Sequence, residues 1–298
     1  MKKMLFVFNP NSGKAQIKNM LLGILEIFSR ADYEITIYPT KATKDGYYYI
    51  KENDGKYDIV VCSGGDGTLN ETVAAIMEYQ NSKPPIGYIP SGTTNDFARS
   101  LSIPKDMINA ATHIVGGFPQ KVDIGRFNGR YFNYVAAFGA FTEVSYATPQ
   151  STKNILGHQA YIIEGVKSIT SIKPYHLKIE LDDKVIEGDF IYGMITNSKS
   201  IGGFKNIAGK HVKLNDGLFE FTLFRHPKNP IDLQKIISSL VTQDYHNDMT
   251  IHECVSSIRM TSDAPIAWVL DGEYGGEHSE VFFEVEREAV DIIVNKKL

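Results

Sequence analysis

The N-terminal 120 residues alternate short apolar runs with segments of helical periodicity. Four runs have the length and apolar character of buried strands, at residues 4–8, 34–38, 58–62 and 85–89. Apolar positions at helical spacing follow them, at residues 17–28, 43–52, 71–79 and 106–115. Strands that alternate with helices in this way are typical of a parallel sheet covered by helices. The pattern therefore predicts an α/β domain of residues 1–122.

After residue 122 the pattern becomes that of antiparallel strands. Strand-like runs occupy residues 122–127, 130–135, 176–181, 185–196, 217–225, 255–260, 266–270 and 281–285, with helical patterns at 159–169 and 230–242. Asn128-Gly129 separates the first two runs, and this pair favours the tight turn of a β-hairpin. We expect residues 123–287 to form an antiparallel β-sandwich or barrel. Residues 288–298 should return to the first domain through a last strand at 289–294.

Length and composition leave this picture unchanged but exclude several function classes. With 298 residues, of which 43% are hydrophobic, the chain can form two domains with large cores. A net charge of −4 and a pI near 6.1 give no general attraction to nucleic acid or to an anionic membrane. Cys62 and Cys254 lie far apart and no His/Cys cluster has zinc-site spacing, so a reduced cytoplasmic protein is expected. No apolar run approaches the roughly 18 residues of a membrane span, which predicts a soluble or at most peripheral protein.

Residues 63–71, Ser-Gly-Gly-Asp-Gly-Thr-Leu-Asn-Glu, join a predicted strand to a predicted helix. Their glycines let the backbone turn tightly and expose N–H groups beside a helix N-terminus, which suits a phosphate. A dinucleotide fingerprint would need glycine at Asn70, and a Walker A loop would need Gly-Lys-Ser/Thr. Asp66 in the turn would repel a bare phosphate, so a Mg²⁺ ion or a cationic neighbour is implied. The alternative is an ordinary tight turn with a solvated Asp66.

Polar turns also follow the other predicted parallel strands. Residues 9–14 contain Asn9 and Lys14, Thr40 follows the second strand, and residues 91–96 follow the fourth. Parallel sheets bind ligands beyond the carboxyl ends of their strands. These turns and the glycine turn should therefore converge on one crevice.

Taken together, these motifs closely resemble those of the bacterial soluble diacylglycerol kinase family, whose wider relatives include sphingosine and ceramide kinases. They stand in the family's order at residues 9–14 (Asn-Pro-Asn-Ser-Gly-Lys), 64–71 (Gly-Gly-Asp-Gly-Thr-Leu-Asn-Glu), 90–98 (Pro-Ser-Gly-Thr-Thr-Asn-Asp-Phe-Ala), 214–218 (Leu-Asn-Asp-Gly-Leu) and 271–273 (Asp-Gly-Glu). The resemblance implies an α/β nucleotide-binding domain of the NAD kinase/diacylglycerol kinase type, followed by a β-sandwich domain that helps to hold a lipid. It places ATP near Asn9, Thr40, Gly64, Gly65, Asp66, Gly67, Thr68, Asn70, Glu71, Ser91, Gly92, Thr93 and Asn95.

The resemblance also implies a Mg²⁺ ion in the second domain. Its ligands would be the Asp216 carboxylate and the backbone carbonyls of Lys213 and Leu218. By themselves, these residues indicate only a turn into a strand.

Phosphoryl transfer requires in-line positioning, neutralisation of phosphate charge and a group that takes the proton of the attacking hydroxyl. Lys14 can add positive charge, and Asp66 and Asp96 can bind a catalytic Mg²⁺ directly or through water. Asp271 and Glu273 are two residues apart, so in an extended chain both carboxylates face one site. Their repulsion would raise one pKa toward the range of a general base. Position puts Asp271 slightly ahead of Glu273, and the alternative is a solvated hairpin turn.

We therefore predict an ATP- and Mg²⁺-dependent lipid kinase of phospholipid biosynthesis, with diacylglycerol as acceptor and phosphatidic acid as product. An NAD kinase-like small-molecule kinase is one alternative, although Asn70-Glu71 and the 91–96 turn speak against it. A non-catalytic nucleotide-binding regulator on the same fold is the other. Expected partners are ATP, the lipid and, transiently, the inner face of the membrane, with no nucleic acid. Residues 141–161 are a candidate lip of the lipid groove, and the oligomeric state stays open, with a homodimer among the options.

Overall fold

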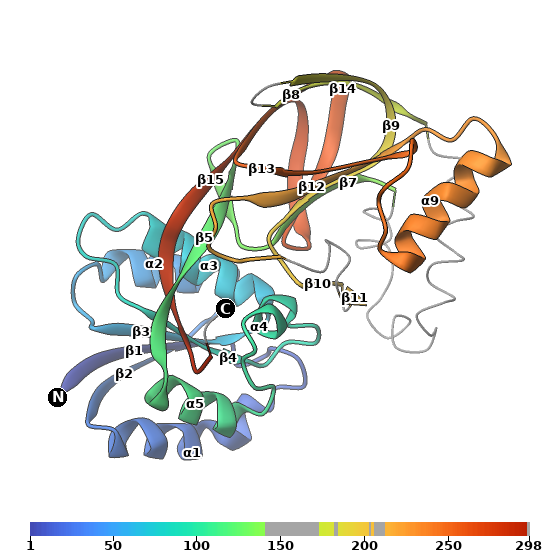
Figure 1. Cartoon of the computed structure of the whole chain (residues 1–298). Coiled ribbons are helices and arrows are strands. Elements are labelled where there is room, and N and C mark those ends of the chain that lie inside the picture. Colours follow the sequence, from blue (N-terminus) through green and yellow to red (C-terminus); the bar gives the residue numbers. More distant parts are fainter. Residues whose placement is uncertain (141–172, 182–183, 203, 206–211, 297–298) are drawn as a thin grey trace.

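The computed structural model describes residues 1–140, 173–181, 184–202, 204–205 and 212–296 of the chain. Its N-terminal part contains the strands β1 (Lys2–Phe8), β2 (Tyr33–Pro39), β3 (Ile59–Gly64) and β4 (Ile86–Pro90). These strands are parallel and lie in the order β2-β1-β3-β4. The helices of this part are α1 (Ile17–Arg30), α2 (Asp45–Glu52), α3 (Asp66–Met77), α4 (Asp96–Ser100) and α5 (Met107–Gly116). Figure 1 shows α1 and α5 on one face of the sheet and α2 and α3 on the other, as predicted for an α/β fold.

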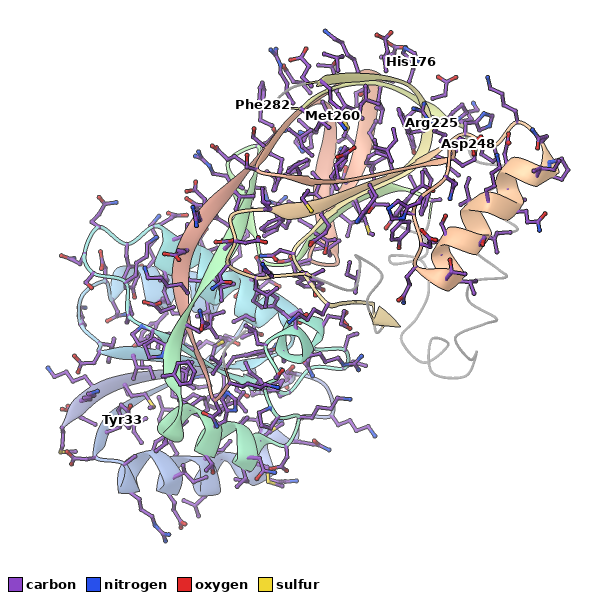
Figure 2. The ribbon with its side chains drawn as sticks, in the orientation of Figure 1. Tyr33, His176, Arg225, Asp248, Met260 and Phe282 are labelled. Atoms are coloured by element: carbon purple, nitrogen blue, oxygen red, sulfur yellow. The ribbon has the colours of Figure 1, made fainter. Side chains whose placement is uncertain are left out.

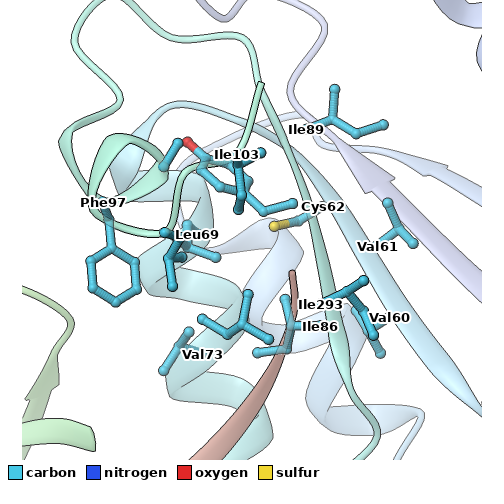
Figure 3. Close-up of a cluster of buried hydrophobic side chains, with 14 of the residues drawn as sticks. Val60, Val61, Cys62, Leu69, Val73, Ile86, Ile89, Phe97, Ile103 and Ile293 are labelled. Atoms are coloured by element: carbon cyan, nitrogen blue, oxygen red, sulfur yellow. The ribbon is translucent and has the colours of Figure 1, made fainter. Parts of the chain in front are cut away.

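Helices on both faces leave the central strands without a solvent-facing side. Every residue of β3 and β4 is buried, so these strands are continuous apolar runs rather than alternations of apolar and polar residues. Leu69 and Val73 of α3 belong to the same buried cluster as Cys62 of β3 and Ile293 near the C-terminus (Figure 3). Each fully buried side chain of this size stabilises the fold by about 1.5–3 kcal/mol. The cluster therefore fixes α3, and with it the glycine turn, against the sheet.

The C-terminal part consists mainly of antiparallel strands. They are β5 (Phe118–Phe127), β6 (Arg130–Phe132), β7 (Val135–Gly139), β8 (Tyr175–Leu181), β9 (Lys184–Thr196), β10 (Ser200–Ile201), β11 (Phe204–Lys205), β12 (Phe219–Arg225), β13 (Thr250–Val255), β14 (Ser257–Leu270) and β15 (Glu273–Val294). Both β9 and β14 pair with β7 near one end and with β8 near the other. This double pairing curls the sheet around a second apolar core that includes Trp268, Phe190 and Phe219. The predicted antiparallel β-sandwich is confirmed, and α9 (Pro230–Thr242) lies at its edge (Figure 1).

Strand β15 runs through both parts of the molecule. It pairs with β14 over its first half, and near its end it pairs in parallel with β4 through Ile292 and Ile86. A register irregularity and a left-handed φ of 49° at Glu288 mark the point between the two parts. In Figure 2, Tyr33 on β2 and Phe282 on β15 lie toward opposite ends of the molecule.

Most predicted elements are present, including the Asn128-Gly129 hairpin turn, in which both residues have positive φ (45° and 82°). The helix expected at 71–79 begins earlier, at Asp66, because an acidic residue in the first turn is favoured by the helix dipole. The runs 255–260 and 266–270 belong to one strand, β14, since the polar residues between them form a pairing irregularity rather than a turn. Likewise, 281–285 and 289–294 are both parts of β15. Strand β13, in which three of the six residues are polar, has no counterpart among the predicted strands.

The predicted helix 159–169 and the candidate lip 141–161 lie outside the described residues. Of the helices that the structure describes, none is long and apolar enough to cross a membrane.

Candidate functional site

The turns after β1, β3 and β4 meet at one edge of the parallel sheet. The backbone N–H of Asn9 donates to the carbonyl of Ser63 at 2.9 Å. Those of Ser91 and Gly92 donate to the carbonyl of Gly64 at 2.8 and 3.2 Å. The convergence expected from the strand order is therefore present, and it is held by backbone hydrogen bonds.

Glycines allow these turns to pack closer than side chains would permit. A β-carbon at Gly92 would lie 2.5 Å from the α-carbon of Gly65 and 2.8 Å from Oδ1 of Asn95. One at Gly13, whose φ is +56°, would lie 2.3 Å from the carbonyl oxygen of Ser91. At Gly65 the nearest atom would be 3.5 Å away, which is ordinary van der Waals contact. Gly13 and Gly92 are thus required by the packing of the turns, whereas a β-carbon at Gly65 would be accommodated without a shift.

The side chains of Asn95 and Tyr88 form hydrogen bonds that hold the turns after β3 and β4. The Asn95 side chain accepts from the Gly92 N–H at 3.0 Å and donates to the Gly92 carbonyl at 2.8 Å. The buried Tyr88 hydroxyl lies 3.2 Å from the Gly64 carbonyl and 3.3 Å from Asn95 Oδ1. Asn95 itself has a left-handed φ of 52°, which asparagine tolerates better than most residues.

Helix α3 starts inside the glycine turn, with Gly65 as its N-cap and Asp66 as its first residue. The first N–H groups of a helix have no acceptor within the helix, and its dipole is positive at that end. Backbone N–H groups at Gly65, Asp66 and Gly67 are therefore in the arrangement that binds phosphate oxygens in other helix N-termini. Thr68, in the same turn, is partly buried, and Thr93 on the facing turn is exposed.

Asp66 and Asp96 form a close acidic pair between α3 and α4. Asp66 accepts from the backbone N–H groups of Asp96 and Phe97, at 3.2 and 3.3 Å. Burial and the nearby Asp96 charge raise the pKa of Asp66 to about 6. Asp96 is 1% exposed, and its Oδ1 accepts from the Ser200 hydroxyl at 2.7 Å. Two largely buried carboxylates that repel each other are a donor set suited to Mg²⁺, a hard cation that prefers oxygen ligands.

Asp271 is buried, and its carboxylate is surrounded by donors. Oδ2 accepts from the Asn133 backbone N–H at 2.6 Å and from the Asn70 side chain at 2.8 Å. Oδ1 accepts from the backbone N–H groups of Tyr134 and Val135 at 3.0 and 3.1 Å. Burial raises the pKa of Asp271 to about 6, although these hydrogen bonds act in the opposite direction. Asp271 thus anchors the start of β7 to α3.

Glu273 has a different environment from Asp271. It is exposed at the start of β15, and its Oε1 would lie 2.9 Å from a β-carbon added at Gly67. Its carboxylate therefore faces the first turn of α3, where the N–H groups described above are located. Burial, with the Glu273 charge as a further cause, raises the pKa of Glu71, so the two glutamates lie near each other.

Three other residues predicted for the site, Glu71, Thr40 and Lys14, lie in three different segments of the chain. Glu71 accepts a hydrogen bond from the Lys44 backbone N–H at 2.7 Å, so its carboxylate helps to hold the N-terminus of α2 on α3. Thr40 is partly exposed at the end of β2, and its N–H donates to the Phe8 carbonyl at 2.9 Å. Lys14 is exposed in the turn after β1.

The loop at residues 213–218 is held by the buried carboxylate of Asp123. Asp123 accepts from the Gly217 N–H and from the Glu288 N–H, both at 2.6 Å, and its own N–H donates to the Leu214 carbonyl at 2.8 Å. Asp216 is exposed and accepts from the Leu218 N–H at 3.2 Å. Within the described ranges, no three His, Cys, Asp or Glu side chains form a metal-binding group, and a site here would use one carboxylate with backbone carbonyls.

Residues Ser200, Asp123 and Asn133 were not among the predicted site residues. Ser200 contacts Asp96 from a position 104 residues later in the chain, and Asn133 contacts Asp271 across 138 residues. A serine or an asparagine at such a distance carries no periodicity or motif that could indicate the contact.

Comparison with known proteins gave two family matches that together span most of the chain. Residues 3–127 match the diacylglycerol kinase catalytic domain, and residues 135–294 match the YegS C-terminal NAD kinase beta sandwich-like domain. The chain is 34% identical to a diacylglycerol kinase of Bacillus subtilis (strain 168), covering 93% of this chain and 91% of the relative. It is 37% identical to a diacylglycerol kinase of Staphylococcus aureus (strain MRSA252), covering 100% of this chain and 95% of the relative.

Solved structures of other proteins have the same fold as this chain. A Bacillus anthracis (strain Sterne) structure assigned as a candidate diacylglycerol kinase superimposes with a TM-score of 0.84 at 25% identity, covering 99% of this chain and 95% of the other. An NAD kinase from Archaeoglobus fulgidus in complex with ATP gives a TM-score of 0.51 at 14% identity, covering 99% and 94%, and supports the fold alone.

Proposed function

Because this chain belongs to the bacterial diacylglycerol kinase family, we propose that it is a lipid kinase that transfers the γ-phosphoryl group of ATP to the free hydroxyl of diacylglycerol, giving phosphatidic acid. The observation that carries this proposal is the position of Glu273. Its carboxylate faces the first turn of α3, beside N–H groups that suit phosphate and a carboxylate pair that suits a divalent cation.

In this proposal the N-terminal turn of α3 binds the phosphates of ATP. The facing turn at Gly92 and Thr93 closes one side of this phosphate site. The exposed Lys14, in the turn after β1, would supply positive charge. Asn9 and Thr40, at the ends of β1 and β2, border the same edge and extend the nucleotide site along it.

Asp66 and Asp96 would hold the Mg²⁺ ion that accompanies ATP. The bound cation would neutralise charge on the phosphate oxygens. Asp66 is fixed for this role by the backbone N–H groups at the start of α4, and Asp96 is fixed by the Ser200 hydroxyl. A second Mg²⁺ at Asp216 and the carbonyls of Lys213 and Leu218 would stiffen the loop that Asp123 already holds.

Glu273 is the better general base of the two candidates. The Asp271 carboxylate accepts four hydrogen bonds and is 6% exposed, so accepting a proton would break an existing contact. Glu273 is exposed and faces the site, so a lipid hydroxyl can reach it. This order reverses the one that sequence position suggested, because position does not indicate which carboxylate is buried. Asp271 would instead position Asn70 and the segment from Asn133 to Val135.

The proposed reaction is a single in-line displacement. The acceptor hydroxyl loses its proton to Glu273 and forms a bond from its oxygen to the γ-phosphorus of ATP. The bond from that phosphorus to the β,γ-bridging oxygen breaks, and ADP leaves with the electron pair. Positioning and charge neutralisation supply most of the acceleration in such reactions, which agrees with a site built mainly from backbone N–H groups and carboxylates.

The test is transfer of radiolabelled phosphate from ATP and Mg²⁺ to diacylglycerol in mixed micelles, beside a total lipid extract and NAD as other acceptors. Labelled phosphatidic acid that is lost in Asp66→Ala and Glu273→Gln supports the proposal. Glu277→Gln, an exposed glutamate on the same strand, is the matched control and should keep full activity. Label in another lipid would exclude diacylglycerol as the acceptor, label in NAD would indicate a small-molecule kinase, and ATP binding without transfer to any acceptor would indicate a nucleotide-binding regulator.

A further inference from the structure

The contact between Ser200 and Asp96 joins two distant parts of the chain. Asp96 is the first residue of α4, and Ser200 is the first residue of the short strand β10 that follows β9. The hydroxyl donates to Asp96 Oδ1 at 2.7 Å, and the two residues are 2% and 1% exposed. A buried hydroxyl that donates to a carboxylate makes one of the stronger hydrogen bonds in proteins.

Ser200 is itself held in place by two further serines. Its N–H donates to the Ser198 hydroxyl at 3.1 Å, and that hydroxyl donates to the Ser200 carbonyl at 2.6 Å. The Ser100 hydroxyl lies 2.8 Å from the Ser198 hydroxyl and accepts from the Lys199 N–H at 3.0 Å. The segment from Ser198 to Ser200 is therefore attached to α4 at Ser100 as well as at Asp96.

Asp96 and Ser100 are one helical turn apart, at positions i and i+4 of α4, so they lie on the same face of the helix. That face is covered by the segment from Ser198 to Ser200, which comes from the C-terminal part of the chain. Asp66 also contacts the start of α4, because its carboxylate accepts from the N–H groups of Asp96 and Phe97. One oxygen of Asp96 is thus fixed from the second part of the molecule, while the carboxylate lies beside its acidic partner on α3.

We infer that Ser200 is a positioning residue that orients the Asp96 carboxylate for binding the divalent cation, and that the Ser100–Ser198 contact holds Ser200 in place. This inference rests on the proposed function, because it deepens the role given there to Asp96. Its consequence is that the cation site is complete only when the segment after β9 is packed on α4. The C-terminal part then contributes to the cation site through a hydrogen bond, in addition to any contact it makes with the lipid.

The first test measures cation binding without turnover. Mn²⁺ would be titrated into the full chain with ADP and followed by electron paramagnetic resonance, for the wild type and for Ser200→Ala. Removing a residue that orients a metal ligand typically weakens binding by about 10- to 100-fold, and we expect a loss in this range. Ser200→Thr keeps the hydroxyl and should restore part of the affinity.

Ser239→Ala is the matched control, because Ser239 is also a buried, hydrogen-bonded serine and lies on α9, away from the site. Both alanine variants should unfold at similar temperatures, whereas only Ser200→Ala should lose Mn²⁺ affinity and need more Mg²⁺ for half-maximal rate. Ser198→Ala should give a smaller loss in the same direction. Wild-type Mn²⁺ affinity in Ser200→Ala would overturn the inference, as would an affinity loss in Ser239→Ala equal to that in Ser200→Ala.

The two proposals fail in different ways. If the wild-type chain transfers no phosphate to lipid, diacylglycerol kinase activity is refuted, while the Mn²⁺ titration still decides the role of Ser200. If the kinase is active and Ser200→Ala has the wild-type Mg²⁺ requirement, the inference on Ser200 is refuted and the proposed function stands.

Discussion

Replacing Gly92 by alanine tests whether the close contact between two turns forms the nucleotide site. The added β-carbon would lie 2.5 Å from the Gly65 α-carbon, whereas non-bonded carbons prefer about 3.5–4.0 Å. The turns must therefore separate by about 1 Å or more, since the obstructing atom belongs to the backbone and cannot rotate away. Such a shift would stretch the 3.2 Å hydrogen bond from the Gly92 N–H to the Gly64 carbonyl and strain the neighbouring 2.8 Å bond from Ser91.

The expected cost combines two terms. Overpacking a well-packed site costs about 1–3 kcal/mol, and each weakened hydrogen bond adds about 1 kcal/mol. We expect Gly92→Ala to lower the free energy of unfolding by about 3 kcal/mol and to weaken ADP binding by at least about tenfold, since 1.4 kcal/mol corresponds to a factor of ten. Urea denaturation and isothermal titration calorimetry with ADP measure the two quantities.

Two other glycines provide graded controls. Gly116 ends α5 with nothing within 4 Å of an added β-carbon and no positive φ, so Gly116→Ala should be neutral within about 0.5 kcal/mol. Gly129 has equal space but a φ of +82°, so Gly129→Ala should cost about 1–2 kcal/mol from backbone strain alone. If Gly92→Ala is as stable as Gly116→Ala and binds ADP with wild-type affinity, the close contact of the turns does not form the nucleotide site.

Three further predictions concern single side chains. Glu273→Gln should lower turnover by about 10²- to 10⁴-fold without changing the unfolding temperature. Asp271→Ala should lower both turnover and the unfolding temperature, because it leaves four donors without their acceptor. Equal stability of the two variants in a thermal unfolding assay would contradict these separate roles. The pKa of Asp66 in the folded chain, near 6, lies above its ordinary value of 3.8, so the folded state binds the proton more tightly. In cation-free buffer the free energy of unfolding should therefore fall as pH rises from about 4 to 6. Asp66→Asn should flatten this slope in denaturation at several pH values, and an unchanged slope would refute the assignment. Asp123→Ala removes the acceptor of the partly buried N–H groups of Gly217 and Glu288 and should destabilise the chain by about 2–4 kcal/mol in urea denaturation. A wild-type stability would rule out the anchoring role.

The fold could be predicted largely from the sequence because its signals are local. Strands β3 and β4 are buried on both faces and are therefore continuous apolar runs, and the glycine turn between β3 and α3 marks the ligand edge of a parallel sheet. The hairpin at Asn128-Gly129 is likewise determined by the preference of those two residues for positive φ. Element boundaries were less certain where polar residues continue a strand, as in β14 and β15, because a pairing irregularity and a turn have similar composition.

The sequence by itself determined the order of strands and helices, the glycine turns and the set of acidic residues available for chemistry, since each depends on residues close together in the chain. Only the tertiary structure decided how those acids differ. Asp271 is buried among donors that include Asn70, 201 residues away, while Glu273, two residues further on, is exposed and faces α3. Likewise, Asp96 is oriented by Ser200, a residue with no motif of its own. The physical reason is that the burial of a carboxylate and its hydrogen bonds depend on which distant segments pack around it, and packing between distant segments leaves no local pattern in the sequence.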